Sequence, residues 1–406
     1  MEQSNHFSID PTTVVDILTL RYTTKLKSPL KKLTWDDFKP NNLAPSLDSI
    51  EKMIQDSIKN AIGISRKKVT IALSGGVDST LVLALLKKTL PELEIEAISI
   101  KFADSVDETP RAAQLAEKYQ IKHHVVFLEN YLAELPKAIS FIGLPFWDLH
   151  FYHVAKKAQT LSDYLISGDG ADELFGGYTF RYSKFLTLIE PNSTPLQKVV
   201  AYLNCHERDF VPDQEEIFDK KANFSWKSIH EKLLPYFDNP LPPLEQVFLA
   251  DYNGKLLYNW SPLFKKIVNH FGIQLVTPII SKQLIEYANH IPAHLKYDKQ
   301  NNLGKILLRK LLEKYVDKTF IHPTKHGFTV ETINLWQSYG KKLCDYYLSE
   351  SRIVKDGWIN YDWITKYINK SDLDVRYINK FFGLLAFEIW YRLFITNELK
   401  SDTILN

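Results

Sequence analysis

The 406-residue sequence has two cysteines, two methionines and no marked excess of charge of either sign. Cys205 and Cys344 are far apart and form neither a Cys-x-x-Cys pair nor a metal-binding pattern, so we expect reduced thiols in a cytoplasmic protein. Lysine and arginine (50) nearly balance aspartate and glutamate (48), which argues against the basic surface of a nucleic-acid-binding protein. No apolar run approaches the roughly 18 residues needed to span a bilayer, and polar residues interrupt any signal-peptide core at the start. We therefore expect no membrane association.

The apolar residues that are present suffice for one large or two ordinary domains, since 45% of the chain is hydrophobic. We expect a lead-in segment at 1–45, an α/β nucleotide-binding core at 46–185 and a mainly helical remainder at 186–406. The proline-rich stretch 186–243 is expected to be irregular or loosely helical.

Strand and helix patterns alternate through the first half of the chain. Strands are expected at 69–73, 95–102, 123–127 and 163–167, and helices at 46–62, 79–88, 107–119, near 130–140 and at 149–160. After about residue 180 the strand signal fades, and helices are expected at 197–204, 244–258, 281–291, 303–315 and 376–397. Alternation of this kind predicts a parallel, twisted sheet flanked by helices, with ligands bound beyond the carboxyl ends of the strands.

The most informative segment is Ser74-Gly75-Gly76-Val77-Asp78-Ser79, which follows the first strand and opens a helix. Such a turn aims backbone N–H groups and the positive helix end at one point, which favours a phosphate ligand. The pair Gly75-Gly76 lets the backbone approach that ligand closely. Asp78 suits such a site if a divalent cation lies between carboxylate and phosphate. The segment lacks the Gly-Lys-Ser/Thr ending of a Walker A loop.

A second glycine-rich segment, 167–178, follows the strand expected at 163–167. It carries three acids, Asp169, Asp172 and Glu173, within five residues, and these would repel one another without a cation or a positive side chain close by. Both segments follow strand ends, so a parallel sheet brings them to one edge.

Together these segments resemble the synthetase domain of the asparagine synthase family, over roughly residues 10–330. The first is similar to the pyrophosphate loop of ATP pyrophosphatases, and the second to the family string Ser-Gly-Glu/Asp-Gly-x-Asp-Glu-x-Phe-x-Gly-Tyr. The family's later Lys-x-x-Leu-Arg helix and Lys-x-Gly-Phe loop are matched, in order, by Lys305 to Arg309 and by Lys325 to Phe328.

The resemblance implies that ATP activates a carboxylate as an acyl-adenylate, and that an amine then displaces AMP to form an amide. It implies Mg²⁺ held by Asp78 and Asp172, a positive charge from Lys325 on the phosphates, and a role for Asp169 in orienting or deprotonating the amine. Asp78, Asp169 and Lys325 are therefore the expected catalytic residues. The expected nucleotide contacts are Leu73, Ser74, Gly75, Gly76, Asp78, Ser79, Ser99, Ser167 and Gly168.

The sequence departs from the family at two places. Glu2 stands where glutamine-using members carry a nucleophilic cysteine, and only about 68 residues precede the first strand, so we expect no glutaminase half. Ammonia would then come from solution or from a separate glutaminase subunit, or the nucleophile is another amine. The segment Pro278-Ile279-Ile280-Ser281 replaces the family's Pro-Phe-Leu-Asp, which leaves the acceptor open between aspartate and other small-molecule carboxylates.

Three other functions share part of this pattern. A natural-product or intramolecular amide synthetase would share the same adenylating core. A tRNA-modifying pyrophosphate-loop enzyme would call for paired cysteines or a basic surface, which this chain lacks. An inactive scaffold is disfavoured because Asp78, Asp172 and Lys325 are all present. The sequence leaves a homodimer open.

Overall fold

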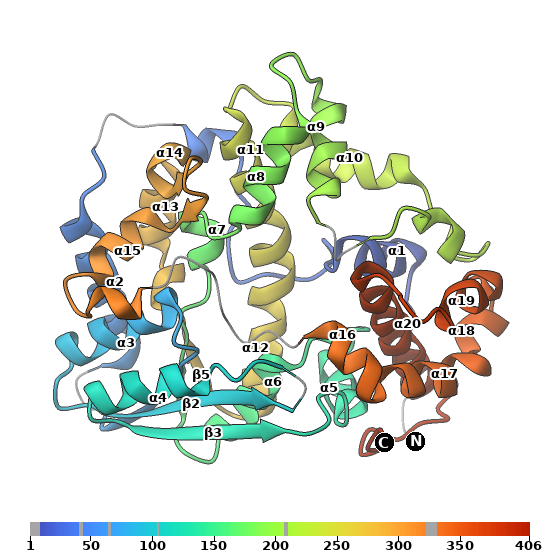
Figure 1. Ribbon diagram of the computed structural model, residues 1–406, viewed down its shortest axis with the longest axis horizontal. Helices are drawn as coiled ribbons and strands as arrows, with labels where there is room; N and C mark the ends of the chain where they lie inside the picture. Colours follow the sequence, from blue (N-terminus) through green and yellow to red (C-terminus); the bar gives the residue numbers. More distant parts are fainter. Residues whose placement is uncertain (1–8, 40–43, 64–65, 104, 207–209, 322–330) are drawn as a thin grey trace, which may run out of the picture.

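The computed structural model describes residues 9–39, 44–63, 66–103, 105–206, 210–321 and 331–406. Its five-stranded sheet consists of β1 (Lys68–Ala72), β2 (Glu94–Phe102), β3 (Lys122–Leu128), β4 (Tyr164–Ile166) and β5 (Gln274–Val276). The order is β3-β2-β1-β4-β5, and every neighbouring pair is parallel. The predicted parallel sheet is confirmed within the described residues (Figure 1).

The helices near the sheet are α2 (Leu47–Ile62), α3 (Val77–Thr89), α4 (Thr109–Lys118), α5 (Leu135–Ile142), α6 (His150–Ala158), α7 (Ala171–Phe175) and α12 (Ser261–His270). α3 and α4 connect strands in one direction across the sheet, whereas α6 precedes a strand on the other side of β1. Because crossovers between parallel strands are right-handed, these connections lie on opposite faces of the sheet. The order therefore reverses between β1 and β4, which is where open parallel sheets bind ligands.

The remaining α-helices of the described chain are α1 (Pro11–Leu20), α8 (Thr179–Leu188), α9 (Pro195–Asn204), α10 (Trp226–Phe237), α11 (Pro243–Asp251), α13 (Lys282–Asn289), α14 (Ala293–Lys296), α15 (Ile306–Leu312), α16 (Thr332–Leu335), α17 (Lys341–Ser349), α18 (Arg352–Lys355), α19 (Tyr361–Ile368) and α20 (Val375–Phe394). Two short strands, β6 (Tyr297–Asp298) and β7 (Leu303–Gly304), form an antiparallel pair just before α15. In Figure 1, α16 to α20 gather at one end of the molecule, and α1 lies beside α20 although it opens the described chain.

Helix α2 shows how local chemistry sets these elements. Ser46 caps its start by accepting a hydrogen bond from the Ser49 N–H, and Ile50, Ile54 and Ile58 are fully buried at helical spacing. Gly63 then ends the helix with a positive φ of 72°.

The expected strands correspond to β1 to β4, but the sequence interpretation missed β5. Only three residues of β5 form ladder pairs, and they directly follow the helical pattern of α12, so no alternation was visible. The helix expected at 244–258 is also divided, because α11 gives way to a wider π-helical segment, Tyr252–Trp260. The stretch 186–243 contains two regular helices, α9 and α10.

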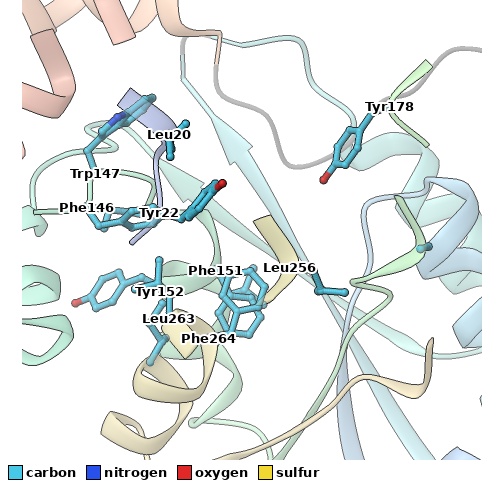
Figure 2. Close-up of a cluster of buried hydrophobic side chains, with 14 of the residues drawn as sticks. Leu20, Tyr22, Phe146, Trp147, Phe151, Tyr152, Tyr178, Leu256, Leu263 and Phe264 are labelled. Atoms are coloured by element: carbon cyan, nitrogen blue, oxygen red, sulfur yellow. The ribbon is translucent and has the colours of Figure 1, made fainter. Parts of the chain in front are cut away.

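Aromatic packing joins α6 to α12 below the sheet edge. Figure 2 shows Phe151 of α6 and Phe264 of α12 lying face to face, with ring centroids 3.7 Å apart. Leu263 and Tyr152 lie in the same cluster. Through this contact α12 is held beside β5. In the part of the chain that the structure describes, no helix combines the length and the apolar character needed to cross a bilayer.

Candidate active site

The loop between β1 and α3 is a compact glycine turn. Gly75 has a positive φ of 74°, and Gly76 is the N-cap of α3, so the turn passes directly into the helix. The hydroxyl groups of Ser74 and Ser79 lie 3.2 Å apart across it, and the Gly76 N–H donates to Ser74 Oγ at 3.3 Å. Backbone N–H groups at the start of α3 therefore face the carboxyl edge of the sheet, where an anion is favoured.

The loop after β4 touches this turn directly. Ser167 extends β4 by donating its N–H to Val276 O at 2.9 Å. A Cβ atom on Gly168 would lie 2.8 Å from the carbonyl carbon of Asp78 and 2.9 Å from the backbone nitrogen of Ser79. Only glycine allows so close an approach, which explains why this residue follows the strand. The two predicted loops are therefore neighbours, as the sequence interpretation required.

Lys305 joins the two loops electrostatically. Its Nζ forms a short ion pair with Asp78 and lies 2.9 Å from Asp172 Oδ1. Gly177 makes room for this contact, because a Cβ there would lie 1.7 Å from Asp172 Oδ1 and 2.4 Å from Lys305 Cε. Burial opposes the charged amine, but the carboxylates of Asp172 and Asp78 outweigh burial and hold the pKa of Lys305 above its usual value. The amine is therefore a fixed positive charge.

The backbone of Lys305 is unusual for a residue with a side chain. It adopts a left-handed conformation with φ of 57° immediately before α15, and its N–H donates to Phe175 O at 3.1 Å. A non-glycine residue in this region is uncommon and costs free energy. The packing of α15 against α7 therefore positions the lysine between the two loops.

Two arginines add positive charge near the site loops. A Cβ on Gly75 would lie 3.1 Å from Arg111 Cγ, so Arg111 of α4 covers the β1–α3 loop, and its guanidinium donates to the Phe320 carbonyl. Arg309 of α15 donates from Nε to Gly304 O at 2.9 Å. Burial lowers the pKa of each arginine, while Asp78 acts in the opposite direction on Arg309. Arginine remains charged nonetheless.

Asp169 accepts a short hydrogen bond from the Ser167 hydroxyl. Burial raises its pKa, and the carboxylates of Asp78 and Asp172 add to the rise against the effect of Ser167 and His150. His150, at the start of α6, has its Nδ1 2.7 Å from Asp148 Oδ1. Burial opposes its charge, but the Asp148 carboxylate raises the pKa of His150 overall.

The remaining predicted residues divide into two groups. Leu73 and Ser99 lie behind the β1–α3 loop, both almost fully buried, and Ser99 Oγ donates to the Leu73 carbonyl. His123 Nε2 lies 2.8 Å from the same hydroxyl. Nucleotide contact by Leu73 and Ser99 stays a prediction. Lys325 lies outside the described residues.

The carboxylates of the described site bear on whether it can hold Mg²⁺. No group of three or more histidine, cysteine, aspartate or glutamate side chains is placed to hold a metal among the residues that the structure describes. Two carboxylates, Asp78 and Asp172, nevertheless converge on a single point, the Lys305 amine. Mg²⁺ is commonly held by one or two carboxylates together with substrate phosphates, so this donor set fits that ion.

Sequence reasoning missed Lys305, Arg111 and Arg309 as site residues. The sequence marks Lys305 and Arg309 only as part of a matched Lys-x-x-Leu-Arg motif, and the signal that could identify them is the pairing of this basic motif with the acidic segment 167–178. Nothing local distinguishes Arg111 from a surface arginine. Its place over Gly75 follows from the packing of α4.

Comparison with known proteins provides evidence that is independent of the site geometry. The asparagine synthetase [glutamine-hydrolyzing] 1 of Bacillus subtilis (strain 168) is 26% identical over 405 residues, covering 91% of this chain and 63% of that protein. An asparagine synthetase [glutamine-hydrolyzing] of Gallus gallus is 28% identical over 322 residues, covering 74% of this chain and 46% of that protein. The chain thus spans about three-fifths of the Bacillus relative and less of the Gallus relative.

Among solved structures, the NH3-dependent NAD synthetase from Campylobacter jejuni is 21% identical and covers 51% of this chain and 93% of its own, with a TM-score of 0.27. A TM-score this low supports no statement about this fold. The sequence model described as asparagine synthase matches residues 49–392, well over half of the chain and both loops of the site. The chain therefore belongs to the asparagine synthase family.

Proposed function

We propose that this protein is an ATP-dependent carbon–nitrogen ligase that adenylates a substrate carboxylate, releases pyrophosphate and then forms an amide from an amine. The observation that carries the proposal is the convergence of Asp78 and Asp172 on the Lys305 amine, beside a glycine turn that opens α3. Family membership supports the reaction class. Aspartate is the default acceptor, as the names of the relatives suggest.

In the first step a carboxylate oxygen attacks the α-phosphorus of ATP. The bond from that phosphorus to the bridging oxygen breaks, and pyrophosphate leaves with negative charge. The start of α3, with Ser74 and Ser79, receives the terminal phosphates, while Lys305, Arg111 and Arg309 neutralise the growing charge. Mg²⁺, when held by Asp78 and Asp172, supplies further positive charge to the phosphates.

In the second step the amine nitrogen attacks the acyl carbon, and the bond from that carbon to the AMP oxygen breaks. The attacking nitrogen loses a proton, and in this proposal the Asp169 carboxylate, which lines the cavity at the carboxyl edge of the sheet, accepts it. Its raised pKa makes it a better base than an ordinary aspartate. Ser167 orients this carboxylate through its hydroxyl.

The decisive experiment incubates the full chain with ATP and Mg²⁺, a panel of amino-acid carboxylates, and either ammonium or glutamine. AMP and pyrophosphate are quantified, and the product is identified by mass. Equal amounts of AMP and amide, dependent on one carboxylate, are expected. Formation of ADP, or no nucleotide cleavage with any acceptor, would refute the proposal.

A second candidate, a natural-product or intramolecular amide synthetase, is favoured by one observation. Ile280 stands at the changed Pro278–Ser281 turn and packs against the Asp169 loop, since a Cβ on Gly170 would lie 2.4 Å from Ile280 Cγ1. The family pattern carries a leucine at the Ile280 position, so the difference in charge lies at Ser281, which lacks the carboxylate of the family's aspartate and suits a substrate other than aspartate. AMP formation with apolar carboxylates or amines, but not with aspartate and ammonium, would select this candidate.

A further inference from the structure

A cavity of about 680 Å³ lies along the free edge of β5. At one end it reaches Asp169, Thr277 and Ile280, at the carboxyl edge of the sheet. Helix α12 forms a wall through Phe264, and Leu275 of β5 lines the cavity across from it. The cavity therefore extends from the exposed residues Asp163 and Lys265 to Asp169.

The inner wall is apolar and rigid. Trp260 and Phe264 lie with ring centroids 5.5 Å apart, and Phe264 is backed by the stacked ring of Phe151 seen in Figure 2. Leu275 and Ile280 complete the apolar lining, and both are only half-buried, so their side chains remain open to a ligand. Such walls are typical of pockets that bind apolar groups.

Charged side chains lie at both ends of the cavity. Arg66, Asp163 and Lys265 are at the outer part, and all three are exposed. Arg66 pairs with Asp163 at 3.4 Å, so Lys265 leaves this part with one net positive charge. At the inner end Asp169 supplies a carboxylate, which suits a positively charged or hydrogen-bond-donating group such as an amine.

The size of the cavity is informative. An ammonia molecule takes up about as much space as water, roughly 30 Å³ in the liquid. The volume of about 680 Å³ instead lies within the range of roughly 300–1,000 Å³ seen for pockets that bind drug-sized molecules. Ammonia alone would leave most of this volume unfilled.

We propose that this cavity binds the amine substrate, a primary amine with an elongated apolar body whose nitrogen lies at Asp169. This inference rests on the proposed amidation and names its nucleophile class. The amine nitrogen attacks the acyl carbon, AMP leaves, and the proton passes to the Asp169 carboxylate, while the apolar body lies between Phe264 and Leu275.

The test measures binding without ATP, so that it does not depend on catalysis. Ethyl-, butyl- and hexylammonium chloride are titrated into the full chain by calorimetry and by tryptophan fluorescence, because Trp260 lines the cavity. Each added methylene is expected to tighten binding about fourfold. Hexanoate, which has a chain of the same length, is expected not to bind because Asp169 repels it.

Two variants sharpen the test. Leu275→Trp fills the cavity and is expected to abolish the dependence on chain length. The matched control is Leu196→Trp on α9, where the side chain is 47% exposed and away from the cavity, and it should bind like the parent protein. Asp169→Asn should weaken every amine at least about tenfold while the chain-length dependence persists.

Affinity that does not depend on chain length, equal binding of hexanoate, or unchanged binding in Leu275→Trp would overturn the inference. These results are separable from the proposed function. AMP and pyrophosphate formation with ammonium, combined with length-independent binding, would leave the ligase reaction standing and remove the amine assignment. Length-dependent binding without any ATP cleavage would instead remove the ligase reaction.

Discussion

Two buried charge clusters in this protein use similar groups for different ends. In one, Lys305 lies between Asp78 and Asp172 at the carboxyl edge of the sheet. In the other, Arg181 of α8 pairs with Asp251 of α11 at 3.1 Å, inside the helical part. The first joins loops that follow two strands, whereas the second joins two helices.

Solvent access separates the two clusters. The side chains of Asp78 and Asp172 are 23% and 18% exposed, while that of Asp251 is fully buried. Glycines surround the first cluster, whereas aromatic rings close the second, where the Tyr202 hydroxyl donates to Asp251 at 2.9 Å and the Tyr178 ring lies 4.0 Å from the Arg181 guanidinium. A ligand can reach the first cluster but not the second. The first is therefore suited to chemistry and the second to holding the helices together.

The largest expected effect is on catalysis at the first cluster. Asp78→Asn or Asp172→Asn should reduce the rate of AMP formation by at least about 10²–10³-fold, because the phosphates lose a preorganised charge arrangement. Urea unfolding should show that either variant folds. A rate within threefold of the parent would remove that carboxylate from the mechanism.

The second cluster should respond in stability. Asp251→Ala removes the carboxylate from the buried Arg181 guanidinium and should lower the free energy of unfolding by about 3–5 kcal/mol, measured by urea denaturation. Tyr202→Phe, which removes one hydrogen bond to Asp251, should cost only about 1 kcal/mol and covers the case in which the first variant fails to fold. The rate of AMP formation per folded molecule should be unchanged in both, and a loss of rate would contradict the comparison.

Disturbing the contact between the β1–α3 loop and the loop after β4 is expected to have a smaller effect on stability. Gly168→Ala introduces a Cβ 2.8 Å from the Asp78 backbone, so the loops must separate, with a stability cost of about 1–3 kcal/mol and a raised KM for ATP. Gly63→Ala is the control: a Cβ there has nothing within 4 Å, and the positive φ of Gly63, which Gly168 does not share, is the source of strain. It should lose stability through backbone strain alone, with KM unchanged. An equal KM for ATP in both variants would show that the loop contact does not shape the nucleotide site.

The smallest expected change in stability depends on pH, and it has opposite signs for Asp169 and Asp251. Burial raises the pKa of Asp169, so its contribution to stability is present below its unfolded pKa and is lost as pH rises through the folded value. Burial also opposes ionisation of Asp251, but Arg181 and His206 outweigh it and lower the pKa, so its contribution is lost as pH falls. Asp169→Asn should therefore stabilise the protein at pH 7 by roughly 0.5–2 kcal/mol while reducing amide formation.

The pH profile checks this sign. The stabilisation by Asp169→Asn should shrink as pH is lowered, and the acid limb of the amidation rate should disappear. If the variant is destabilised at pH 7, Asp169 is charged at no cost in the native protein, and its assignment as a tuned base is wrong.

Much of this site could be predicted from the sequence, because the sequence patterns that indicate it are local. A glycine turn after an apolar strand dictates a close anion approach at Gly75 and Gly76 wherever it occurs. The acidic residues of 167–178 predict a positive charge close by, and the Lys305 amine supplies it. The fifth strand was hidden, since three residues at an edge carry no readable period.

The amino-acid sequence alone determined the two glycine loops, their carboxylates and the alternation of strands and helices that builds a parallel sheet. Each of these features depends on a few adjacent residues. Only three-dimensional packing placed Lys305 between Asp78 and Asp172, set Arg111 over Gly75 and opened a cavity beside Asp169. The physical reason is distance along the chain. Lys305 is 227 residues from Asp78, and no local preference can specify an ion pair across that separation.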